Sequence, residues 1–183
     1  MSNSELLERA TLLRELLSRG AISQLKELGG ESAGTAFLRE DERFIEISVI
    51  AYACAKFFEK PYISQSNEWK KLILELDALL ERAASALEAG REEEFAKDLD
   101  SSVAGLQGLS KTLGRFVVNV VDKARIKAAT QIYAHGGSLG TAAELGRVDK
   151  KELSNYIGQT TLSEKYKTVD LKKRLQAADE LFN

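Results

Sequence analysis

The scarcity of proline is the feature that most constrains the fold of this chain. Among 183 residues there is one proline, Pro61, so there are few positions at which a helix is forced to stop. Apolar residues recur every three or four positions along most of the chain, as they do in helices that bury one face. We therefore predict an all-α fold.

The stretch from Asp41 to Phe58 predicts the central helix of an N-terminal bundle, because from Ile47 onward it is apolar on nearly every side. Two paired strands at 44–50 and 116–121 are an alternative, since the first alternates and the second is β-branched. We prefer helices because neither stretch has flanking hairpin signals. The small residues of 29–35 predict a loop after a short helix over 21–28.

A heptad pattern runs from Trp69 to Ala86, where apolar residues follow one another at spacings of three and four. It indicates a long amphipathic helix packed inside its own bundle, and a seam between two copies of the chain is the alternative. We expect this helix to end at Gly90 and the next one to begin at the acidic triplet 92–94, where negative charge favours a helix start.

Several classes of site are excluded by residue type. A single cysteine, Cys54, cannot form an internal disulfide, and with one histidine, His135, the chain cannot build a Cys/His zinc site. No phosphate-binding loop, Glu-x-x-His pair or nucleophile elbow occurs. We expect Cys54 to be inert packing and His135 to satisfy carbonyls at a helix end. No catalytic residue, metal or cofactor is therefore predicted.

A membrane location is not expected. No run of about 18 uncharged apolar residues occurs, and the first twenty residues carry both acidic and basic side chains, unlike a signal peptide. We predict a cytoplasmic protein.

The net charge of −2 is the balance of two unequal parts. Residues 1–110 hold 13 basic and 20 acidic side chains, whereas 111–183 hold 13 basic and 8 acidic ones. The C-terminal part should therefore attract polyanions. We predict two domains, an acidic helical bundle over 1–113 that could dimerise and a basic domain over 114–183.

Three short helices are indicated between residues 123 and 158. The first ends at Ala134 before a glycine pair, with Tyr133 expected on its buried face. Ser138 can cap the second, which Gly146 closes. The third has a capping box formed by Asp149 and Glu152, and the residues expected on its buried face are Leu153, Tyr156 and Ile157.

This succession resembles the helix-turn-helix domains of DNA-binding transcription regulators. The run from Lys123 to Tyr166 also resembles archaeal proteins described as predicted transcriptional regulators. Compared with the simplest helix-turn-helix domains, Leu153 and Tyr156 come one residue late after Gly146, so we expect a turn that is one residue longer. The resemblance implies that the third helix reads DNA in the major groove.

A third helix in the major groove would present its exposed residues to the bases. The predicted base-contacting residues are Lys150, Lys151, Ser154 and Asn155, whose side chains suit base edges. Phosphate contacts are predicted from Arg147, Lys123, Arg125 and Lys127, together with Lys165 and Lys167. A terminal amphipathic helix over 169–182, capped by Thr168, is expected to pack on the bundle or on a partner chain.

The predicted function is therefore that of a sequence-specific regulator of transcription that binds double-stranded DNA as a homodimer. Paired half-sites would compensate for the acidic Asp149 and Glu152 near the DNA. The alternative is an RNA- or ribosome-associated protein, or a protein-interaction module, that uses the same basic face.

Overall fold

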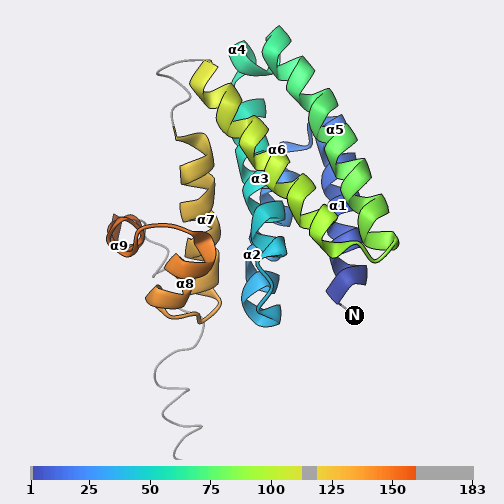
Figure 1. Ribbon diagram of the computed structural model, residues 1–183. Coiled ribbons are helices and arrows are strands. Elements are labelled where there is room, and N and C mark those ends of the chain that lie inside the picture. Colours follow the sequence, from blue (N-terminus) through green and yellow to red (C-terminus); the bar gives the residue numbers. More distant parts are fainter. Residues whose placement is uncertain (1, 113–118, 160–183) are drawn as a thin grey trace, which may run out of the picture.

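The computed structural model describes residues 2–112 and 119–159, and every regular element in these two ranges is an α-helix. The first six are α1 (Ser2–Arg19), α2 (Ile22–Arg39), α3 (Arg43–Phe58), α4 (Pro61–Ser64), α5 (Asn67–Glu88) and α6 (Glu92–Thr112). They are followed by α7 (Val120–Ala134), α8 (Leu139–Gly146) and α9 (Lys150–Gln159) (Figure 1). The all-α fold is confirmed. The predicted terminal helix and the boundary between 113 and 114 lie outside the described residues.

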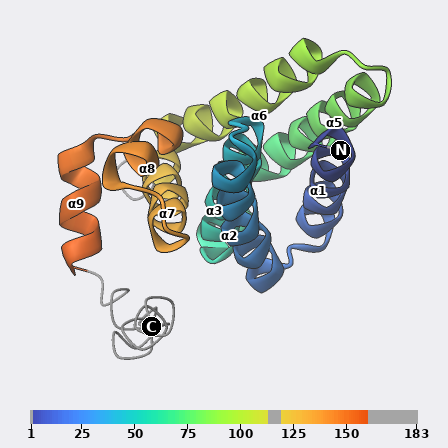
Figure 2. The same ribbon diagram turned by 90° about the horizontal axis from the view of Figure 1, so that it is seen from below.

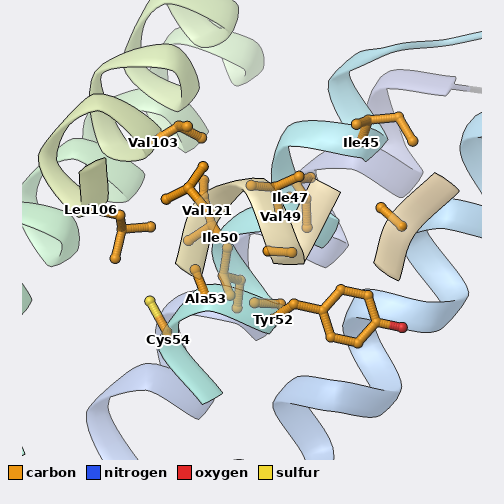
Figure 3. Close-up of a cluster of buried hydrophobic side chains, with 14 of the residues drawn as sticks. Ile45, Ile47, Val49, Ile50, Tyr52, Ala53, Cys54, Val103, Leu106 and Val121 are labelled. Atoms are coloured by element: carbon orange, nitrogen blue, oxygen red, sulfur yellow. The ribbon is translucent and has the colours of Figure 1, made fainter. Parts of the chain in front are cut away.

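Helix α3 is the centre of the bundle, as predicted. Nearly all of its residues are buried, and α1, α2, α6 and α7 all contact it. Figure 3 shows Val103 and Leu106 of α6 and Val121 of α7 among the side chains of α3. Each large apolar side chain buried in this way stabilises the fold by about 1.5–3 kcal/mol. The sequence is apolar on every side of α3 because neighbours surround the helix.

The alternative of a strand at 44–50 is wrong. Glu46 and Ser48, which produced the alternating pattern, are polar residues buried within the helix. The Ser48 hydroxyl donates to the carbonyl oxygen of Gly29 at 2.7 Å, so it joins α3 to α2. Because buried polar side chains can be satisfied by partners on neighbouring helices, the polar residues at these positions do not indicate a strand.

The predicted loop at 29–35 is also wrong, because α2 continues through it to Arg39. The small residues there let neighbouring helices approach. A Cβ atom added to Gly29 would lie 3.1 Å from the Tyr52 ring of α3, and one on Gly34 would lie 2.9 Å from the His135 ring. Glycine at these positions serves close packing and not chain flexibility.

Helices α5 and α6 form an antiparallel pair that covers one side of α1 and α3. The Ser66 side chain caps α5 by accepting from the Trp69 amide at 3.1 Å. Gly90 has a φ of +74° between the two helices, and the acidic triplet opens α6 as predicted. Of the seam residues, Leu79 is half-buried and the others are buried inside the bundle: Trp69, Leu72, Leu76, Ala83 and Ala86. The heptad pattern thus belongs to internal packing.

One hydrophobic core extends across both predicted domains. Residues from α1 to α3 belong to the same buried cluster as Val120 and Ile132 of α7 and Leu153 of α9. Helix α7 contacts α2 and α3 as well as α8 and α9, so it attaches the last two helices to the bundle. Among the described helices, none combines the length and the apolar composition needed to span a bilayer.

Candidate nucleic-acid interface

Helices α7, α8 and α9 form a compact unit at one edge of the molecule. Figure 2 shows α7 against α2 and α3, α8 packed on α7, and α9 at the outer end of the succession. Helix α7 ends at Ala134 as predicted, α8 and α9 begin and end within one residue of the predicted positions, and α7 begins at Val120, three residues before the predicted segment. The unit therefore has the short second and third helices expected of a helix-turn-helix.

The junction between α7 and α8 is fixed by side-chain and backbone contacts. His135 ends α7, and its Nδ1 lies 2.8 Å from the carbonyl oxygen of Gln131, as expected of a residue that satisfies a helix end. Gly136 follows with a φ of +99°, which favours glycine. The Ser138 hydroxyl then accepts from the Thr141 amide at 3.0 Å and caps α8. Tyr133 was expected to be buried but is exposed.

Helix α8 crosses α7 closely through small residues. Ala142 and Ala143 are buried, and a Cβ atom on Gly146 would lie 2.7 Å from that of Ala129. Gly146 is the last residue of α8, as predicted, and it also allows the close contact with α7. The left-handed conformation that the turn requires falls on the next residue, Arg147, which has a φ of +53°.

Helix α9 begins at a capped N-terminus. The Asp149 Oδ1 atom accepts from the backbone amides of Lys151 and Glu152, each at 2.9 Å. Leu153 is fully buried, while Tyr156 and Ile157 are half-buried against the core. The cap and the buried face formed by Leu153, Tyr156 and Ile157 orient the helix, and its other positions are exposed.

The exposed residues of α9 divide between two faces. Lys150, Lys151, Ser154 and Gly158 form what we term the open face, where no neighbouring helix covers them. Glu152, Asn155, Tyr156 and Gln159 border a cavity between α9 and the bundle. Asn155 lies at the boundary of the two faces. The four predicted base-contacting residues are thus all exposed, and three of them share the open face.

The two predicted phosphate-contacting arginines point toward α3. Arg125 of α7 forms a two-pronged pair with Glu46, with Nη1 and Nη2 lying 3.2 and 3.0 Å from its carboxylate oxygens. Both side chains are nearly buried. Arg125 is therefore a structural residue, and phosphate contact by it is not available in this conformation.

Arg147 occupies the turn and reaches two glutamates of α3. Its guanidinium donates to Glu42 at 2.9 Å and lies 3.2 Å from Glu46. The hydrogen bond with Glu42 is the main reason that the pKa of Arg147 is raised. A non-glycine residue in the left-handed region costs roughly 1 kcal/mol, and these ion pairs hold Arg147 there. The turn is thereby attached to the bundle.

The two predicted lysines of α7 face the cavity. Lys123 and Lys127 line it together with Lys26 and Glu27 of α2, Tyr52 and Lys56 of α3, and the α9 residues already named. The volume of the cavity is about 710 Å³. The structure therefore separates Lys123 and Lys127 from the open face of α9. Lys165 and Lys167 lie outside the described residues.

Sequence reasoning missed Glu42, Glu46 and Tyr52, which lie far from α7–α9 in the chain. Nothing local in the sequence marks Glu46 as the partner of two arginines. The available signal was the position of Glu46 in a largely apolar segment, because a carboxylate buried there needs a cationic partner.

Comparison of the chain with protein-family models, curated proteins and solved structures gives no match. The function is therefore inferred from the residues and geometry of α7–α9.

Proposed function

We propose that this protein is a sequence-specific transcription regulator that binds double-stranded DNA by placing the open face of α9 in the major groove. The observation that carries the proposal is the exposure of Lys150, Lys151 and Ser154 on a short, capped helix at the edge of the molecule. Among the described helices, α9 lies at the outer end of the succession α7–α9, away from α1, α5 and α6 (Figure 2).

The chemistry of the open face suits base edges and phosphates. Lysine donates to the guanine O6 and N7 acceptors, and serine can donate or accept. Asn155, at the border of this face, can form two hydrogen bonds with adenine. The ammonium groups of Lys150 and Lys151 also neutralise phosphates that flank the groove. Helices α7 and α8 contact α9, Leu153 is buried in the core, and Arg147 attaches the turn before α9 to α3.

We further propose that two copies bind paired half-sites. Asp149 and Glu152 lower the potential near the N-terminus of α9, so one open face alone would bind weakly. Two faces related by a twofold axis would engage half-sites about 34–36 Å apart. The acidic bundle would supply the contact between copies, away from the DNA.

Selection from a pool of random duplexes, followed by fluorescence anisotropy on the enriched sequence, tests the proposal. We expect a palindromic enriched site and an affinity that falls with salt, with a slope of roughly −0.9 per neutralised phosphate. In Lys151→Ala and Asn155→Ala, discrimination at single base pairs should fall by about 1–3 kcal/mol. Lys97→Ala, an exposed lysine of α6, is the matched control and should bind as the unaltered protein does.

Failure to enrich any duplex would contradict the proposal. Cosedimentation of the protein with ribosomal particles, without duplex binding, would favour the RNA-associated alternative. Equal losses in Lys97→Ala and Lys151→Ala would indicate binding through overall charge and would remove α9 from the proposal.

A further inference from the structure

We propose that the cavity between α9 and the bundle is a binding site for a small amphipathic organic anion, such as an aromatic carboxylate or sulfonate. All four of α2, α3, α7 and α9 contribute lining residues, and α7 lies between α9 on one side and α2 and α3 on the other (Figure 2). Its volume of about 710 Å³ falls within the range of about 300–1,000 Å³ that is usual for small-molecule sites. The inference does not depend on DNA binding.

The apolar part of the cavity fits an aromatic ring or a short hydrocarbon chain. Tyr52 of α3 and Tyr156 of α9 contribute rings from opposite walls, and Val120 and Ile126 contribute aliphatic surface from α7. Tyr52 is nearly buried, so its ring is held in place by the bundle. Rigid aromatic walls favour a flat ligand, because little side-chain freedom is lost when it binds.

The charged residues that line the cavity favour a ligand that carries one negative group. Lys26 and Lys56 share the carboxylate of Glu59, at 2.5 and 2.6 Å. Within residues 2–112 and 119–159, Lys123 and Lys127 form no ion pair, although they lie one helical turn apart and line the same cavity. Like charges at this spacing repel each other, and an anion that contacts both would relieve the repulsion.

The acidic residues of the cavity argue against a polyanion. Glu27 and Glu152 also line it, and Glu59 already neutralises part of the charge of Lys26 and Lys56. The excess positive charge is therefore small and suits a single carboxylate or sulfonate better than a nucleic-acid strand. The side-chain amides of Gln131 and Asn155 can donate hydrogen bonds to the same ligand.

A titration of the full-length protein with 8-anilinonaphthalene-1-sulfonate tests the inference. This probe combines aromatic rings with one sulfonate, and its fluorescence rises on transfer to an apolar site. We expect saturable binding of one probe per chain. In the double variant Lys123→Gln with Lys127→Gln, affinity should fall at least about tenfold, because charge-assisted hydrogen bonds are lost.

Two controls separate a specific site from general apolar binding. Lys70→Gln with Lys71→Gln removes the same charge from exposed positions on α5 and should leave probe affinity unchanged. The uncharged probe N-phenyl-1-naphthylamine should bind the unaltered protein more weakly than the sulfonate. Circular dichroism and Trp69 fluorescence establish that each variant is folded.

Three results obtained with the sulfonate probe would overturn the inference. They are the absence of saturable binding, an equal affinity in the Lys123 and Lys127 double variant, and an equal loss in the α5 control. Stronger binding of the uncharged probe would also overturn it, because the lysines would then have no part in recognition.

Discussion

Glu46 is the residue on which the attachment of α7 and of the α8–α9 turn depends. Glu46 is a residue of α3, and its carboxylate forms ion pairs with the guanidinium groups of Arg125 and Arg147. Removing charged groups from water is costly, and the cost is offset only when both partners remain. An intact pair of this kind adds little to total stability, but the loss of one partner leaves the other charge nearly buried and uncompensated.

Replacement of Glu46 by glutamine should therefore destabilise the protein strongly. Glutamine keeps the shape but leaves Arg125 nearly buried without a carboxylate, so we expect the free energy of unfolding to fall by about 3 kcal/mol. Urea unfolding followed by circular dichroism measures the change. Glu31→Gln is the matched control, because the Glu31 side chain is exposed and Arg9 keeps Glu5 as a second partner, so the loss should be under about 1 kcal/mol. Similar small losses in the two variants would contradict this account of Glu46.

At the scale of single helices, capping residues and periodicity predicted most of what was found. Ser138, Asp149 and the glycines after α5 and α7 act locally, so their signals can be read from neighbouring residues. The prediction of a loop at 29–35 was wrong because glycine and alanine are common both in loops and where two helices pack closely. Its role depends on Tyr52 and His135, which are distant in the chain.

An exposed helical glycine and a glycine in a close helix contact should respond oppositely to replacement by alanine. Gly108 of α6 has nothing within 4 Å of an added Cβ, so Gly108→Ala should raise the free energy of unfolding by about 0.5–1 kcal/mol. Gly29→Ala would press on the Tyr52 ring and should lower it by about 1–3 kcal/mol. Thermal and urea unfolding of the two variants would test this. A stabilising Gly29→Ala would mean that α2 and α3 are not closely packed there.

At the scale of the whole molecule, the described core is continuous from the bundle into α7–α9. The charge difference between the two parts of the chain was readable from composition, whereas the pairing of Arg125 and Arg147 with α3 was not. The partners are separated by 79 residues in the case of Arg125 and Glu46. As a result, the cations left on α7–α9 are the lysines of the open face and those of the cavity.

The central claim is that the open face of α9 lies against DNA, and directed cleavage of the enriched duplex tests it most directly. Cys54 is fully buried, and burial raises the pKa of its thiol, so a new surface cysteine can be labelled selectively. Gly158→Cys on the open face and Gly108→Cys on α6 are matched positions, since both glycines are exposed and neither has a heavy atom near an added Cβ.

With a phenanthroline–copper label attached, Gly158→Cys should cut the duplex within a few base pairs of each half-site, and Gly108→Cys should not cut it. Cleavage from Gly108→Cys alone, or equal cleavage from both positions, would contradict the account.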